Sequence, residues 1–590
     1  MRAHDPEVRE PLHQVDVAIV GAGPAGMVTA CLLAREGFDT LVLEKSGNFD
    51  REFRGEILQP RFQQALRDVD LYDCVAALPH DDIDGAQIYF HGLRVGKADA
   101  RWIDRRNPHI WWMPQPVLLA GLHAHAGQFP CYQLCFRARA TELFADRTLV
   151  VRRDEETMRI QAKVIIGADG RYSAVRKLGN FELAYDHDDL DVVWFTLDRP
   201  HDYEHYFSFF LGMGNAFLIL PKHPDQLQCG MVFRRGGYQR AKRAGIEHFK
   251  SRLRRGHPAF ARFAETVTDF SPFVPLQGSR SLAKRWAKDG MLLIGDAAHT
   301  CSPAGGIGVA VAVETACVAA KVIADGLRRG DVSDEVLSRV QKIREREVRR
   351  VHAIQGQGRL LLAPLFQPLR FLIPPLVALF SALKIIPLVA RRLLAQQSPM
   401  PVTFSDALTV ADALELYFKR SGFGRETYSD RWVRLPVGPF TLPLPNPKPR
   451  QRVVPLHDVG HVIAEYGTSW SGELQITGYE LGKGLGRYWF GWLIDLQGIW
   501  LGVLLYPRKT LRAFARGRRS GCLYTEFEYG ERLLQMNVGQ VRSRLRIVSK
   551  DEVRVTAADV VALLGRLMLS LIVHAPLLAG LAVVAHWLFS

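Results

Sequence analysis

The sequence has no cysteine pattern that would build a disulfide framework. It carries eight cysteines in 590 residues, and only Cys131 and Cys135 lie close together along the chain. Unpaired spacing of this kind is typical of reduced cysteines in a cytosolic protein. The first 14 residues are polar and charged and contain no apolar stretch, so we expect no secretory signal peptide there.

Signatures of nucleic-acid binding are also missing. The net charge is +15, yet no zinc-finger, RNA-recognition or helix-turn-helix pattern is present. A net positive charge favours binding to an anionic surface. Because nucleic-acid-binding motifs are missing, we expect that surface to be a lipid headgroup layer and not nucleic acid.

Internal repeats and low-complexity tracts are absent as well. A chain of 590 residues, 48% of them hydrophobic, should form two or three domains with large cores.

A glycine-rich turn lies near the start of the chain. Residues 15–45 predict a strand, a turn, a helix and a second strand, with Gly21, Gly23 and Gly26 in a G-x-G-x-x-G pattern where the helix begins. Such glycines permit a tight turn, close approach of a pyrophosphate and close packing of helix and strand. Glu44 ends the second strand, where an acid can hold ribose hydroxyls. The register of all these parts predicts a dinucleotide site rather than a structural turn.

Two further strand-to-turn junctions follow, at Asp169-Gly170 and at Gly295-Asp296. Each alone is compatible with an ordinary junction. The three segments together, in this order and spacing, resemble the para-hydroxybenzoate hydroxylase-like family of FAD monooxygenases over residues 12–350. The resemblance implies an α/β Rossmann-type FAD domain that hydroxylates an electron-rich ring with NADH or NADPH and O₂. We expect residues 181–285, rich in β-branched and aromatic side chains, to form the sheet over the substrate.

The resemblance also implies a set of cofactor-binding residues. The expected FAD contacts are Gly21, Gly23, Gly26, Glu44, Lys45, Arg54, Gln115, Asp169, Asp296, Gly305, Gly306 and Gly308. The chain departs from the family pattern at Ala310 and Thr315, where members often carry Asn and Asp, which puts details of ring positioning in question. No catalytic base is named, because the family has no universal one. The W-x-W-x-I-P signature of tryptophan halogenases is absent, and "WWMPQP" at 111–116 does not replace it.

The middle of the chain is apolar and basic. Residues 351–404 contain "RLLLAPLFQPLRFLIPPLVALFSALKIIPLVARRLL", in which prolines would break a single spanning helix. The stretch is compatible with a helical packing layer of the flavin domain or with a segment lying in the lipid headgroup region. Residues 436–455 are rich in proline and predict an extended chain.

Four polar residues then gather in "PLHDVGHVIAEYGTSWSGE". His457 and His461 are four residues apart and share a helix face, with Asp458 beside the first and Glu473 twelve residues after the second. By spacing alone, a packed histidine pair is the default and a divalent metal site the alternative. The stretch resembles the family of the fourth coenzyme Q biosynthesis protein over residues 405–560. That resemblance implies a mostly helical, membrane-associated domain with a metal, zinc above iron or manganese, on His457, Asp458, His461 and Glu473.

The end of the chain is a candidate membrane anchor. Residues 567–590 contain no Asp, Glu, Lys or Arg, and Arg566 precedes them. A bilayer span needs about 20 apolar residues, although His574 and Pro576 weaken the case. The alternative is a hydrophobic helix packed on the Glu473 domain. We assign residues 561–590 to this hydrophobic C-terminal helix. Together with the arginine-rich residues 508–519, it predicts that the protein lies on the cytoplasmic face of the inner (plasma) membrane.

These features together predict an FAD-dependent monooxygenase of a lipidic, prenylated aromatic ring in quinone biosynthesis, working with a metal-binding helical domain. Its expected partners are a quinone-precursor substrate, O₂, a membrane surface and other quinone-biosynthesis enzymes. Two alternatives stay open. In one, the C-terminal part only presents lipid to a flavin monooxygenase; in the other, the enzyme is a flavin-dependent reductase of prenyl chains.

Overall fold

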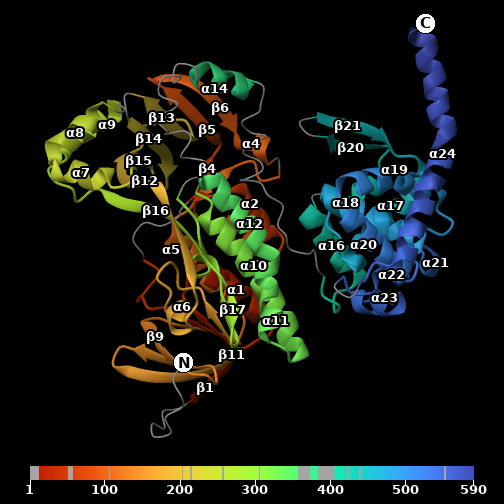
Figure 1. Ribbon diagram of the computed structural model, residues 1–590, viewed down its shortest axis with the longest axis horizontal. Coiled ribbons are helices and arrows are strands. Elements are labelled where there is room, and N and C mark those ends of the chain that lie inside the picture. Colours follow the sequence, from red (N-terminus) through yellow and green to blue (C-terminus); the bar gives the residue numbers. More distant parts are fainter. Residues whose placement is uncertain are drawn as a thin grey trace. The chain divides into compact units, whose positions relative to one another are not determined.

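The computed structural model describes residues 12–50, 57–104, 106–201, 203–212, 215–255, 258–303, 306–356, 373–382, 404–421, 424–437, 440–550 and 553–589. The chain divides into two compact units, Met1–Met400 and Pro401–Ser590. Figure 1 shows the helices and strands of both units, coloured along the sequence.

A mostly parallel sheet forms the base of the first unit. Its path runs β17-β18-β11-β1-β2-β8, and the hairpin strands β9 and β10 extend it from β11. The four strands from β18 to β2, and β8 beyond them, run parallel. Their bounds are β1 Leu12–Val20, β2 Thr40–Leu43, β8 Tyr132–Cys135, β9 Ala138–Leu143, β10 Thr148–Arg153, β11 Glu156–Gly167, β17 Ala287–Lys288 and β18 Met291–Leu293. Strands buried on both faces read as near-continuous apolar runs, as β1 does here.

Helices cover this parallel sheet and bury its apolar side chains. The helix α1 packs between α10 and α5, and α10 also contacts α2 and α12. Their bounds are α1 Pro24–Arg35, α2 Pro60–Arg67, α3 Tyr72–Ala76, α5 Gln115–Ala126, α6 Ala174–Leu178, α10 Gly308–Arg329, α11 Asp334–Leu337 and α12 Arg339–Gly356. This arrangement is the expected α/β Rossmann-type domain.

A second sheet of eight strands follows the order β19-β16-β12-β15-β14-β13-β5-β6. Its bounds are β5 Gly85–Phe90, β6 Leu93–Asp99, β12 Leu183–Asp198, β13 Tyr206–Gly212, β14 Asn215–Lys222, β15 Gln226–Arg234, β16 Val274–Ala283 and β19 His299–Thr300. Residues 181–285 thus form most of a sheet, as predicted. They also include α7 Gly237–Arg243, α8 Ile246–Arg254 and α9 Pro258–Thr266, whose aromatic side chains share a core with β12 and β15.

A small three-stranded sheet, β3-β7-β4, completes the first unit. The strands are β3 Ile57–Leu58, β7 Ile110–Trp112 and β4 Asp81–Ile83, with α4 at Ala100–Ile103. Between residues 357 and 403 of the apolar middle segment, the structure describes α14, Ile373–Ala382. This helix packs on β6, where Ser381 Oγ accepts the Lys97 N–H at 3.1 Å and donates to the Lys97 carbonyl at 2.9 Å. For these ten residues the contacts favour the packing layer over a free interfacial segment.

The described residues of the second unit form helices and one β-hairpin. The hairpin pairs β20 Trp432–Val437 with β21 Phe440–Pro445. The helices are α16 Val410–Ser421, α17 Lys448–Ala464, α18 Trp470–Lys483, α19 Trp489–Leu505, α20 Pro507–Arg518, α21 Leu523–Glu526, α22 Glu531–Leu534, α23 Val538–Arg544 and α24 Ala557–Phe589. The prediction of an extended chain over 436–455 is wrong from Lys448 onward, because Pro449 sits in the first turn of α17, where its missing N–H costs nothing.

Candidate active site and metal cluster

A cavity of about 1040 Å³ opens in the first unit where β1, β2, β11 and β18 end. Ligands of open α/β sheets bind outside the carboxyl ends of the strands, so this is the expected place for a dinucleotide. The predicted residues that line it are Gly21, Gly23, Glu44, Lys45, Gln115, Asp169, Asp296, Gly306 and Gly308. The predicted Arg54 and Gly305 lie outside the described residues.

The glycine turn has the geometry that its sequence predicts. Gly21 has φ +107°, and a Cβ there would lie 2.5 Å from the Ala168 carbonyl oxygen. Gly26 does not line the cavity; a Cβ on it would lie 2.0 Å from the Gly21 carbonyl oxygen. The turn is therefore closed to side chains, and α1 starts beside it at Pro24, so the positive end of the helix dipole lies next to the turn.

Glu44 is buried and fixed from two sides. One carboxylate oxygen accepts the Ala22 N–H at 2.9 Å, and the other accepts the Ser46 N–H at 3.0 Å. These bonds tie the end of β2 to the glycine turn. They hold the carboxylate at the cavity wall, where ribose hydroxyls can donate to its oxygens.

Asp169 and Asp296 differ in burial and in their interaction partners. Oδ2 of Asp169 accepts the N–H groups of Ala174 and Val175 at 2.5 and 3.3 Å, while its buried Oδ1 has no hydrogen-bond partner among the described residues. Burial raises the pKa of this carboxyl. Asp296 is more open, and Arg171 Nε lies 3.6 Å from its Oδ2. A ligand donor in the cavity would satisfy Asp169, since orphaned buried acceptors are costly.

Arg171 and Tyr172 also line the cavity and were missed from the sequence. The sequence does contain a signal for them, because both directly follow the Asp169-Gly170 turn that closes β11.

Thr315, where the chain departs from the family pattern, makes local hydrogen bonds. Its hydroxyl donates to the Val311 carbonyl and accepts from Nε2 of the buried His299, both at 2.9 Å.

The residues present fit a dinucleotide such as FAD. The glycine cradle excludes side chains, a carboxylate stands where ribose is expected, and a buried acceptor lacks a partner. The fold and this cavity define a flavin-dependent oxidoreductase. The family described as "FAD binding domain" matches residues 14–354, and the chain belongs to it.

Named relatives agree with this class, and a solved structure agrees with the fold. The chain is 32% identical over 357 residues to 6-methylpretetramide 4-monooxygenase of Streptomyces rimosus, which covers 59% of this chain and 84% of the relative. It is 27% identical over 348 residues to digeranylgeranylglycerophospholipid reductase of Methanothrix thermoacetophila, covering 55% and 82%. In fold it resembles p-nitrophenol 4-monooxygenase PnpA of Pseudomonas putida DLL-E4, with a TM-score of 0.55, 18% identity and coverage of 65% and 98%.

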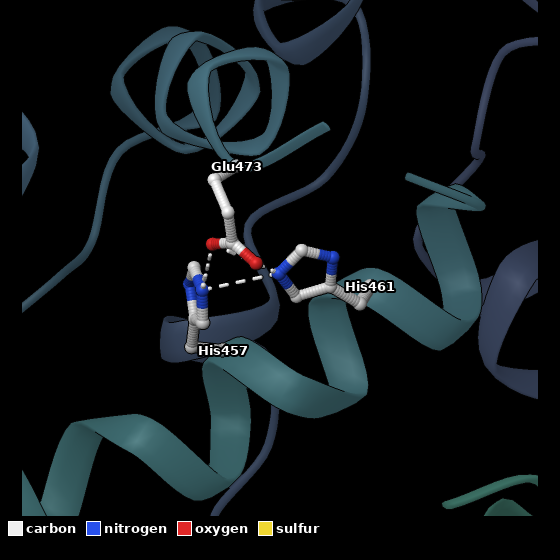
Figure 2. A group of neighbouring side chains, drawn as sticks. All are labelled: His457, His461 and Glu473. Atoms are coloured by element: carbon white, nitrogen blue, oxygen red, sulfur yellow. Dashed lines mark hydrogen bonds and ion pairs between the residues drawn. The ribbon is translucent and has the colours of Figure 1, made fainter. Parts of the chain in front are cut away.

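The structure brings three of the four predicted metal ligands together in the second unit. His457 and His461 project from successive turns of α17, and Glu473 reaches them from the first turn of α18, as Figure 2 shows. The two Nε2 atoms are 3.2 Å apart, and each lies 3.6 Å from Oε2 of Glu473. One ligand atom from each residue lies within 4.8 Å of the others.

Each imidazole ring also makes a hydrogen bond through Nδ1, the nitrogen that points away from the cluster. These bonds decide which species can bind between the Nε2 atoms. Nδ1 of His457 lies 2.8 Å from a carboxylate oxygen of Glu480, and Nδ1 of His461 lies 2.8 Å from the Tyr466 carbonyl. Both partners only accept, so each Nδ1 carries the hydrogen. In the neutral rings both Nε2 lone pairs then face one another and a carboxylate. Three acceptors at this distance require a cation between them, either a proton or a metal ion.

The electrostatics of the cluster agree with a cation site. Burial alone would lower the pKa of His457, but the carboxylates of Glu480 and Glu473 raise it well above its usual range. Burial would raise the pKa of Glu473, yet His461 and His457 hold it below its usual range. The donor set of two imidazoles and one carboxylate is the set that catalytic zinc sites use, with a coordination position left open.

Asp458 does not join this group, and its assignment as a ligand does not fit the structure. Its two oxygens accept the hydroxyls of Tyr417 at 3.1 Å and Tyr428 at 2.8 Å. The physical reason is helical geometry: adjacent residues are about 100° apart around a helix. Asp458 therefore points away from the face that His457 and His461 share. Glu480, by contrast, was missed from the sequence although it lies seven residues after Glu473 on the same face of α18.

An exposed apolar surface lies elsewhere on the second unit, where α19 and α24 pack together. Trp500 Nε1 donates to Ser570 Oγ at 3.0 Å, and Ser570 donates to the Leu496 carbonyl at 2.6 Å, so the helices are joined by hydrogen bonds. The exposed side chains of this α19–α24 surface include Trp489, Leu501, Leu504, Leu505, Val561, Leu564, Met568, Leu571 and Ile572. Among the described residues, α24 is the helix long and apolar enough to span a bilayer, judged by length and composition.

Proposed function

We propose that the protein hydroxylates a lipidic, prenylated aromatic ring in quinone biosynthesis, using FAD, NADH or NADPH, and O₂. The observation that carries the proposal is the continuity of one cavity. It runs from the glycine turn at Gly21 to side chains of the second sheet and its neighbours, namely Trp194, Gln228 and Leu276. A cofactor at one end and an aromatic or aliphatic wall at the other is the arrangement that ring oxidation needs.

Bound FAD would supply the redox chemistry, and the chain supplies placement and shielding. The α1 N-terminus and the Gly21 turn would hold the pyrophosphate, Glu44 the ribose, and Asp296 the polar middle of the cofactor. The sheet of β12, β15 and β16 closes the opposite side with Trp194, Gln228 and Leu276. Its role is to keep water from the reacting ring.

The comparisons support aromatic oxidation as the first candidate. The Streptomyces relative is named a monooxygenase of 6-methylpretetramide at position 4. A second candidate is reduction of prenyl double bonds without oxygen insertion. It is favoured by the relative named digeranylgeranylglycerophospholipid reductase, whose identity to this chain is lower.

The second unit adds a metal site on His457, His461 and Glu473 to the proposal, with zinc the first choice from the donor set. A divalent ion there would act as a Lewis acid on an oxygen of the substrate. If the unit instead only presents lipid, the purified protein should contain no stoichiometric metal, which elemental analysis measures directly.

The proposal also includes a membrane location, on the cytoplasmic face. The α19–α24 surface is apolar, and Arg508, Lys509 and Arg512 follow it on the exposed side of α20. A prenylated substrate resides in the bilayer, so an apolar surface edged with cations would bring both units to it.

Mass spectrometry of the aromatic lipids in a deletion strain tests the proposed function. A hydroxylase predicts accumulation of a ring that lacks one oxygen, restored by the intact gene. Accumulation of lipids with unreduced prenyl chains would instead support the reductase. An unchanged lipid profile would contradict both.

A further inference from the structure

Two residues far apart in sequence meet at the substrate end of the cavity. Trp112 ends β7 in the small sheet, and Gln228 lies in β15 of the second sheet. Nε1 of Trp112 donates to Oε1 of Gln228 at 2.9 Å. Trp112 is 1% exposed and Gln228 is 4% exposed, so this bond is made away from bulk solvent.

The bond settles which way the Gln228 amide faces. An indole N–H can only donate, so the atom next to it must be the amide oxygen. The amide nitrogen is then turned elsewhere. Gln228 lines the cavity, and its Nε2 has no hydrogen-bond partner among the residues that the structure describes. Two N–H donors are therefore available to a molecule in the cavity.

The cavity lining that comes from the second sheet and the small sheet includes large apolar side chains. Trp194 from β12, Leu276 from β16 and Ile57 from β3 line the cavity and give it aromatic and aliphatic walls. A donor held in apolar surroundings is costly to leave unpaired. Such a donor favours ligands with an acceptor oxygen over ligands of the same shape that have none.

We infer that Gln228 is a specificity-determining residue that donates a hydrogen bond to an acceptor oxygen on the substrate ring, and that Trp112 is its positioning residue. The inference rests on the proposed function, in which an aromatic ring occupies this cavity. It narrows the substrate class to rings that bear a phenol, phenolate or quinone oxygen. A pure hydrocarbon ring or an unsubstituted prenyl chain cannot use the donor.

Two probes with one carbon skeleton test this assignment on the full-length flavoprotein. The probe 2-methyl-1,4-naphthoquinone carries two acceptor oxygens and no donor, and 2-methylnaphthalene carries neither. Each is titrated without NAD(P)H while the visible absorbance of the bound FAD is recorded. The measured quantity is the ratio of the two dissociation constants. Changes in the site that affect both probes equally cancel in this ratio.

The main variant is Gln228→Glu, which keeps an acceptor for Trp112 and replaces the donor by a second acceptor. We expect the preference for the quinone over the hydrocarbon to fall by about tenfold, the loss of one hydrogen bond in a buried site. Gln228→Met should have the same effect with an uncharged chain. Gln226→Glu, two residues away on the same strand and outside the cavity lining, should leave the ratio unchanged.

Trp112→Phe examines the positioning role. It should lower the quinone preference while leaving the affinity for 2-methylnaphthalene near that of the wild type, because the freed amide can turn its oxygen to the cavity. An unchanged ratio in both Gln228 variants overturns the inference and leaves the aromatic site standing. If neither probe perturbs the flavin of the wild type, the proposed aromatic site fails and the inference with it.

Discussion

Oε2 of Glu480 lies 2.8 Å from Nδ1 of His457, and Oε1 of the same carboxylate accepts the Tyr524 hydroxyl at 2.6 Å. The carboxylate is 1% exposed. It thus holds the imidazole with Nε2 toward Glu473 and His461. A buried acid behind a histidine fixes the tautomer and raises the basicity of the ligand nitrogen.

Glu480→Gln should therefore weaken the proposed metal site without removing one of its proposed ligands. We expect the affinity for Zn²⁺ to fall by about 10–100-fold, measured by competition with a chelator and by elemental analysis. The control is Glu528→Gln, since Glu528 is 80% exposed and pairs with Arg487 at the surface. Equal metal affinity in the Glu480 variant and the wild type would contradict this role.

The cavity predicts loss of flavin in Asp296→Ala. This change removes the carboxylate that we propose to contact the polar middle of the cofactor, so the purified variant should be depleted in FAD while retaining its secondary structure. Absorbance near the flavin maximum relative to protein provides the measure. Glu182→Ala serves as the control, because Glu182 is exposed and pairs with Lys284 away from the cavity lining. Normal flavin content in the Asp296 variant would refute the assignment.

His299 predicts an acid-sensitive stability of the flavin domain. Burial, with the positive charge of Arg344, lowers the pKa of His299 from 6.5 to about 3. Below pH 6.5 the unfolded chain binds a proton that the folded chain does not, so stability falls as the pH drops from 6.5 toward 3. The slope from one such group is at most about 1.4 kcal/mol per pH unit.

His299→Gln should flatten that dependence, because the amide can still donate to Thr315 but does not titrate. The measurement is the denaturant midpoint of the flavin domain at several pH values between 7 and 4. His248→Gln, at an exposed histidine, should keep the wild-type slope. A slope in His299→Gln equal to that of the wild type would show that other groups cause the acid sensitivity.

Much of the flavin site follows from local sequence, because G-x-G-x-x-G, Glu44 and the junctions at Asp169-Gly170 and Gly295-Asp296 each lie at the end of a predicted strand. The histidine pair also follows, since residues four apart share a helix face. Gln228 and Trp112 could not be paired in this way. They are 116 residues apart, and their meeting depends on how two sheets pack, which no local pattern encodes.

The α19–α24 surface predicts binding to anionic membranes. Leu504 and Leu505 are 76% and 55% exposed, and changing both to Ser removes apolar area from the surface. Burying one such side chain contributes about 1.5–3 kcal/mol, so binding to vesicles with anionic lipid should weaken by at least about tenfold. Sedimentation with vesicles measures it.

Leu93→Ser is the matched control for this prediction. Leu93 is 74% exposed but lies in the first unit, so its change should leave vesicle binding intact. Added salt should weaken the wild type, because Arg508, Lys509 and Arg512 would each contribute roughly 1 kcal/mol at an anionic surface. A wild type that stays in the supernatant with anionic vesicles would exclude the membrane proposal.

The origin of the added oxygen tests the central claim most directly. The full-length flavoprotein is incubated with NADPH, ¹⁸O₂ and a prenylated phenol, and in parallel with NADH, and the products are analysed by mass spectrometry. A ring hydroxylase predicts one ¹⁸O atom on the ring for each product molecule, with no label when the label is supplied as H₂¹⁸O. Oxidation of the nicotinamide without ¹⁸O in the ring, or with saturation of the prenyl chain, would contradict the account.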